Sequence, residues 1–108
     1  MGMEIQREST GSFSLAVANS TPTTARFDAS GSSQFSIFMP ASSSVTSLQF
    51  YSAPTATATM QPVYNSTGAL TITVAQGQNY SSPDELFPHP FIGIKANATD
   101  TITIVQKR

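Results

Sequence analysis

Residues 68–108 read GALTITVAQGQNYSSPDELFPHPFIGIKANATDTITIVQKR, and this stretch decides the fold class. Apolar side chains recur in it at every second residue in three places, with mostly polar or small residues between them: Leu70, Ile72 and Val74; Ile92 and Ile94; Ile102 and Ile104. A period of two is typical of a β-strand that has one face in a core and the other facing water or a partner. The stretch therefore predicts three half-buried strands.

A short helical turn is predicted at residues 82–87, between the first and second of these strands. Ser82 is a favourable capping residue, and Pro83 suits the first helical position. The two acidic residues that follow complement the positive end of a helix, and the prolines after Phe87 prevent the turn from continuing. Leu86 and Phe87 are expected to close one end of the hydrophobic core.

The same alternation recurs nearer the N-terminus and completes an all-β chain. It predicts strands at residues 13–17, 35–37 and 47–52, and shorter or edge strands at 26–27 and 60–64. The low-complexity segment 53–59 is expected to protrude as a loop, and Gly68 is expected to end a hairpin turn. Together these elements predict a single antiparallel β-sandwich of about eight strands over residues 11–108, preceded by an N-terminal arm at residues 1–10. Jelly-roll and immunoglobulin-like connectivity both fit this pattern.

Composition restricts the partners that the protein can have. Charged residues make up 10% of the chain, the net charge is -1, and Ser and Thr together number 30 of the 108 residues. An ordinary soluble domain has about 25% charged residues. Nucleic acid is not expected as a partner, because phosphate binding needs clustered Lys and Arg. A polar surface with so little charge suits a protein that works packed in an assembly.

The chain contains no cysteine, which removes disulfides, thiolate metal sites and cysteine nucleophiles. It must therefore be stable through packing or association. No apolar run approaches the length of about 18 residues that a membrane span needs, and residues 1–10 lack an apolar signal core. We therefore expect a soluble protein made in the cytoplasm, without a membrane partner.

Candidates for catalysis or metal binding are few. His89 is the only histidine and stands between two prolines, which favours a loop residue over a general base. Asp84 and Glu85 are adjacent, and compensation of the helix dipole explains them better than a metal site does. No catalytic residue, metal site or cofactor is predicted, and the chain is not expected to be an enzyme. Four Asn-x-Ser/Thr matches, at Asn19, Asn65, Asn79 and Asn97, are interpreted as turn chemistry.

Three tyrosines offer a different kind of site. Tyr51, Tyr64 and Tyr80 could stack against sugar rings, because an aromatic ring has an apolar face and tyrosine adds a polar tip. Three tyrosines on three separate segments are more often found at the edge of a core or in an interface. Because the rings could still stack on sugars, a host-glycan-binding module is an alternative function.

From Gln34 to the C-terminus the chain resembles a group of small tailed-phage virion proteins. The resemblance is carried by these pieces: FSIFMP at 35–40, Leu48-Gln49-Phe50, Pro62-Val63-Tyr64 leading to the turn at Gly68, TITVAQGQNY at 71–80, the Leu86-Phe87 turn, PFIGIKA at 90–96 and TITIVQK at 101–107. It implies a β-sandwich with a structural role in the virion. Members of such groups look like capsid decoration or cement proteins, head fibres, or connector and tail components.

The resemblance implies a function, a place and partners. The expected function is a non-enzymatic capsid decoration or cement protein on the capsid surface, with a head-tail connector or tail component as the alternative. The expected partners are the major capsid protein and other copies of the chain, with a trimer favoured. In such a protein the N-terminal arm is the natural clamp onto the capsid, and the residues expected to make that contact are Met3, Ile5, Arg7 and Glu8.

Overall fold

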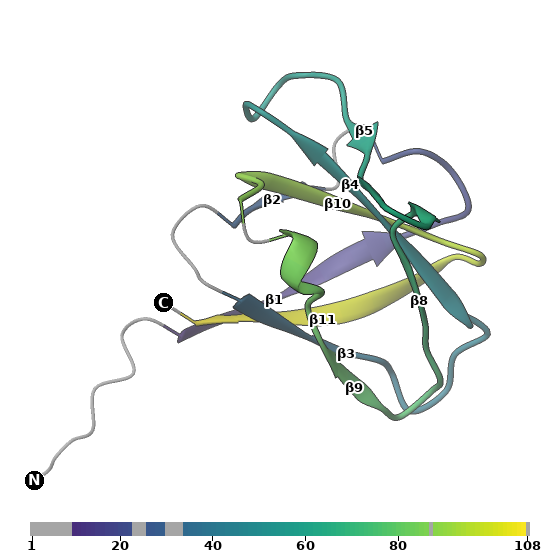
Figure 1. The fold of residues 1–108 in the computed structure, drawn as a ribbon. Coiled ribbons are helices and arrows are strands. Elements are labelled where there is room, and N and C mark those ends of the chain that lie inside the picture. The colour runs from purple at the N-terminus through teal and green to yellow at the C-terminus, as the bar shows by residue number, and fades with distance from the viewer. Residues whose placement is uncertain (1–9, 23–25, 30–33, 87, 108) are drawn as a thin grey trace, which may run out of the picture.

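A computed structural model describes residues 10–22, 26–29, 34–86 and 88–107, and they form two antiparallel sheets packed face to face (Figure 1). The first sheet has four strands in the order β1 (Thr10–Val17), β11 (Asp100–Lys107), β3 (Gln34–Phe38) and β9 (Asn79–Ser81). The second sheet has five: β2 (Arg26–Asp28), β10 (Phe91–Ala96) and β4 (Ser47–Ala53), with both β5 (Gln61–Pro62) and β8 (Thr71–Thr73) paired to β4. The predicted all-β antiparallel sandwich is confirmed.

The strand order decides between the two connectivities that the sequence left open. Leaving aside the two-residue strands β5, β6 (Tyr64–Asn65) and β7 (Gly68–Ala69), the first strand pairs with the last, and the second strand pairs with the one before the last. In an immunoglobulin-like sandwich the first two strands are neighbours in one sheet. Here β1 and β2 lie in different sheets, and the chain crosses between the sheets as in a double Greek key. The sandwich therefore has jelly-roll connectivity.

The core lies between the two sheets and is built from the alternating apolar residues. Ile37, Leu48, Phe50, Ile92 and Ile104 are fully buried. The rings of Phe13, Phe27 and Phe35 add an aromatic group, with centroids 5.3 Å apart for the first pair and 5.1 Å for the second. The predicted period of two is confirmed, because each of these five residues belongs to an alternating series. The interior is filled by side chains.

The helical turn forms as a 3-10 turn, η1 (Asp84–Leu86), and Leu86 is buried in the core as expected. Phe87, its predicted companion, lies outside the described residues. Ser82 has a different role from the predicted cap. Its Oγ accepts a hydrogen bond from the amide of Phe35 at 3.1 Å, and its own amide donates to the carbonyl of Phe35 at 2.8 Å. Ser82 thus fastens the start of the turn to β3.

The predicted turns are confirmed where the structure describes them. Gly68 ends the β6–β7 hairpin with a φ of 128°, in a region that L-residues rarely adopt. Asn65 Oδ1 accepts the amide of Thr67 at 2.9 Å, and Asn97 Oδ1 accepts the amide of Thr46 at 2.8 Å. Asn65 holds its own turn, which agrees with the interpretation of its sequence match, whereas Asn97 fastens the segment before β4 to the end of β10.

The strand predicted at residues 60–64 is interrupted. Val63 lies between β5 and β6, with its side chain buried and its amide donating to the carbonyl of Phe50 at 3.0 Å. Pro62 pairs only with β4, at the edge position predicted for it. The segment therefore stays attached to β4 although it is not one continuous strand.

Candidate interaction surface

The first sheet presents an open outer face. Because Leu15, Ile37 and Ile104 point into the core, the residues that alternate with them point outward. The register of the strands aligns these outward residues in three rows across the sheet. We call the surface that they form the hydroxyl face, and its rows are Ser12, Val105, Ser36 and Ser81; Ser14, Thr103, Phe38 and Asn79; Ala16 and Thr101.

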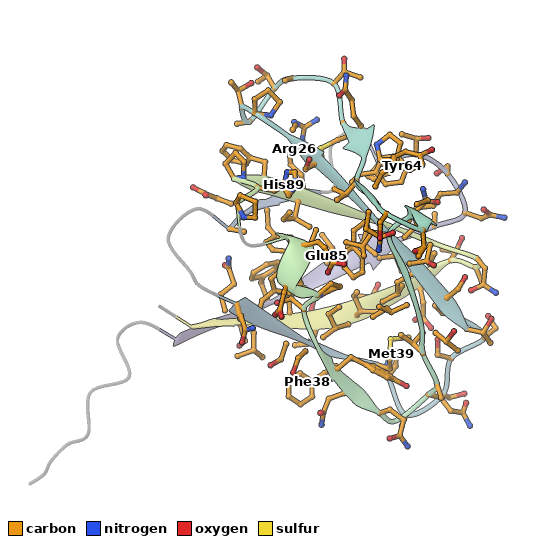
Figure 2. The ribbon with its side chains drawn as sticks, viewed as in Figure 1. Arg26, Phe38, Met39, Tyr64, Glu85 and His89 are labelled. Atoms are coloured by element: carbon orange, nitrogen blue, oxygen red, sulfur yellow. The ribbon has the colours of Figure 1, made fainter. Side chains whose placement is uncertain are left out.

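None of the side chains of the hydroxyl face is charged. On β11, the position that follows Val105 in the alternating series is Lys107, which lies outside the face as defined. Phe38 is 40% exposed, and Figure 2 shows its ring pointing away from the sandwich. Covering a charged surface costs free energy unless each charge finds a partner, whereas hydroxyl groups can donate and accept hydrogen bonds with many partners. The face is therefore suited to contact with another protein surface.

Part of the outer face of the second sheet is covered by the chain itself. Tyr51, Ala53 and Met60 form a small buried cluster there, separate from the main core. A Cβ atom on Gly93 would lie 2.8 Å from Met60 Cε and 2.9 Å from Pro22 Cγ, so the glycine lets these two side chains lie directly on the sheet. The two outer faces therefore differ, since the first is open throughout, whereas loops cover the second around Tyr51 and Gly93.

The loop at residues 53–59 only partly matches the prediction. Residues 54–57 are exposed, as expected of a protruding loop, and Figure 1 shows the loop at the top of the molecule. Its base does bury apolar groups, because Ala53 ends β4 in the outer cluster and Ala58 packs against that cluster. Arg26 Nη1 also donates a hydrogen bond to the carbonyl of Thr55 at 3.1 Å. The loop is thus tied to β2.

A hollow of about 210 Å³ lies beside this loop, lined by Thr21, Pro22, Arg26 and residues 57–60. Sites for drug-sized ligands usually have volumes of about 300–1,000 Å³. Arg26 is the only charged side chain in the lining, and its guanidinium already donates to the carbonyl of Thr55. The hollow has neither the size nor the set of polar groups expected of such a site.

The three tyrosines do not form a common platform. Tyr51 is 6% exposed in the cluster outside the second sheet, and Tyr80 is half-buried against the main core. The hydroxyl of Tyr80 accepts the amide of Ala75 at 2.9 Å. Tyr64 is 65% exposed and lies near the top of the view, on β6 (Figure 2). Only Tyr64 offers an open ring, so the structure does not bring the predicted stacking residues together.

The predicted clamp residues Met3, Ile5, Arg7 and Glu8 lie outside the described residues. The chain enters the first sheet at Thr10, which is paired with Lys107. The segment at residues 1–9 is therefore joined to the sandwich at one corner of the hydroxyl face.

The acidic residues of η1 contact two different neighbours. Asp84 Oδ1 accepts from Gln34 Nε2 at 3.3 Å, and Glu85 Oε2 accepts from Asn65 Nδ2 at 3.4 Å. The two carboxylates therefore diverge. Within the described part of the chain, no three His, Cys, Asp or Glu side chains are grouped so that they could hold a metal ion.

Asp100, the first residue of β11, accepts hydrogen bonds that favour its ionised form. The Ser43 hydroxyl, followed by the amide of Thr101 at 2.7 Å, holds the pKa of Asp100 below its ordinary value of 3.8. Since the folded-state pKa is the lower one, the ionised carboxylate stabilises the fold above pH 3.8, and this stability is lost as pH falls through the folded-state pKa.

We expect Ser43→Ala to raise the pKa of Asp100 toward 3.8 in a carboxyl NMR titration, because the hydroxyl that lowers it is removed. An unchanged pKa would contradict the assignment.

Comparison of the chain with family models, with curated proteins and with solved structures gives no match. The resemblance to phage virion proteins therefore remains a prediction. No helix in the described residues is long and apolar enough to cross a membrane.

Proposed function

We propose that the protein is a non-enzymatic structural component of a tailed-phage virion, a decoration or cement protein that binds the outer surface of the capsid and stabilises the head. The observation that carries the proposal is the hydroxyl face, which is uncharged and open. The resemblance of residues 34–108 to phage virion proteins supports the same reading. The partner is the major capsid protein, the location is the capsid surface, and the chain is made in the host cytoplasm.

The size of the hydroxyl face indicates how such binding works. Four strands spaced about 4.8 Å apart span roughly 15 Å, and three rows along the strands span a similar length. A standard interface buries about 800 Å² on each partner, which is more than a face of this size provides. The proposal therefore assigns further contacts to the N-terminal arm, with Met3, Ile5, Arg7 and Glu8. Repetition over the capsid lattice then strengthens weak single contacts through avidity.

The test compares two Thr-Ile-Thr segments that face outward on opposite sheets. Thr103 lies in the hydroxyl face on β11, whereas Thr73 is exposed on β8 of the second sheet. We expect Thr103→Lys to weaken binding to purified capsids at least about tenfold, because a lysine would be left uncompensated in the contact. Thr73→Lys is the matched control and is expected to bind as the unchanged protein does.

Capsids that carry the protein are also expected to resist heat better than capsids without it. Equal heat resistance together with no capsid binding would overturn the proposal. The number of copies per particle separates the two virion roles, since hundreds of copies indicate decoration, whereas about six or twelve indicate the connector or tail role.

A further inference from the structure

The free edge of β1 differs from the other edges of the two sheets. β1 stands at the end of the first sheet, paired with β11 over all of Thr10–Val17, and no described strand pairs with its other side. The remaining edge strands, β9, β2, β5 and β8, are two or three residues long, and β5 contains Pro62. Short edge strands and edge prolines prevent a sheet from pairing with another chain. The long edge of β1 has neither protection.

The sequence of β1 also lacks the other devices that protect an edge. It reads TGSFSLAV, with no lysine or other charged residue and no proline. Its pairing with β11 proceeds one residue to one residue without a bulge. The outward side chains Ser12, Ser14 and Ala16 are small, so they do not block a strand that approaches from the side. An exposed edge strand of this kind is a template for strand addition.

We propose that β1 pairs with β1 of a second copy of this chain, antiparallel and about a two-fold axis perpendicular to the sheet. Such an isologous contact uses the same edge twice and closes on itself. Residues that lie opposite each other must point to the same face of the sheet. This requires the axis to pass midway between the two copies of one residue, which then lie opposite each other. With the axis at Ser14, Phe13 of one copy lies opposite Leu15 of the other, and such apolar cross-strand pairs stabilise antiparallel sheets.

A second copy fits this edge better than a different partner does. β1 carries no charge, so two copies meet without repulsion and without the need for a complementary charge. With the axis at Ser14, residues 11–17 of the two copies lie opposite one another, whereas head-to-tail addition to β9 would offer only three residues on one side. Pairing also places the two hydroxyl faces side by side in one continuous sheet. The dimer does not depend on capsid binding and is expected to form without a capsid.

The contact is modest in size. An eight-residue strand is about 27 Å long, and the two packed sheets are about 10 Å apart, so the edge presents a few hundred Å² on each copy. Stable interfaces bury about 800 Å² on each partner. We therefore expect a reversible dimer that dissociates on dilution.

The test is the mass of the purified protein in solution, measured by light scattering over a range of concentrations. The mass is expected to approach twice 11.4 kDa at high concentration and to fall about twofold on dilution. Ser14→Lys is expected to give a monomer throughout, because a lysine on an edge strand disfavours pairing. Thr103→Lys is the matched control, since Thr103 is the cross-strand neighbour of Ser14 on the same face but on an internal strand. It is expected to stay dimeric.

Several outcomes would overturn the proposal. They are a monomer at every concentration, a trimer that Ser14→Lys does not affect, and a dimer that both lysine variants dissociate equally, which would indicate packing of the hydroxyl faces instead. If Ser14→Lys does not fold, hydrogen exchange of the unchanged protein decides the question. The β1 amides that point away from β11 are expected to exchange more slowly at high concentration. The absence of such a dependence would equally overturn the proposal.

Discussion

Phe50→Ala is expected to destabilise the protein by about 3–5 kcal/mol, which is the usual cost of removing a buried aromatic ring. Phe50 lies on β4 in the middle of the second sheet, has no exposed surface and is the largest of the fully buried side chains. Domains of this size have free energies of unfolding of about 5–15 kcal/mol. The substitution therefore removes a large share of the total stability, and urea unfolding monitored by circular dichroism measures it.

Phe38→Ala is the matched control for this experiment. Phe38 has the same side chain and also lies in a strand, but it is 40% exposed on the hydroxyl face. Its removal is expected to cost about 1 kcal/mol or less, because substitutions of exposed side chains have small effects. Equal losses for the two variants would mean that the core does not lie between the sheets as described.

Gly93→Val is expected to destabilise the protein by about 1–3 kcal/mol through overpacking on the outer side of the second sheet. Even a single Cβ would come within 3.0 Å of both Met60 and Pro22, and valine adds two further methyl groups. The end of the Met60 side chain can move aside, whereas the Pro22 ring is stiff. The loops that carry these residues must therefore shift outward.

A double-mutant cycle isolates this contact. In a Met60→Ala background the cost of Gly93→Val is expected to be smaller, because one of the two obstacles is gone. Gly11→Ala serves as the control glycine, since no atom lies within 4 Å of its added Cβ, and it is expected to leave stability unchanged within about 0.5 kcal/mol. Additive costs at Gly93 and Met60 would contradict the close approach.

The elements of the fold could be predicted from local sequence because each depends on its own residues. Period-two alternation identified the buried faces at Ile37, Phe50 and Ile104, and all three are fully buried. Gly68 ends a hairpin turn as expected, with a positive φ. These features depend on side-chain direction and backbone sterics, which a short segment determines by itself.

The strand order, and which of the two outer faces is covered by loops, could not be predicted in the same way. Thr101-Ile102-Thr103 and Thr71-Ile72-Thr73 have the same alternating pattern, yet only the first lies in an open four-stranded face. The difference arises from which strands pair, and pairing depends on contacts between residues far apart in the chain. The burial of Tyr51 does not follow from alternation either, because it depends on how the loop after β4 folds back and brings Met60 into the same cluster. The absence of a side chain at Gly93, inside a strand pattern, is a local signal of such a close approach.

The pairing of β1 with β11 has a consequence for how the chain is made. β11 lies between β1 and β3, so the first sheet has a gap until residues 100–107 have left the ribosome. Until then Leu15 and Ile37 have no strand between them to close the core. Folds that depend on such distant pairings form slowly, and their incomplete chains expose strand edges that can aggregate. The nascent chain is therefore expected to need protection by chaperones until residues 100–107 have emerged, and refolding from denaturant is expected to be governed by the insertion of β11 between β1 and β3.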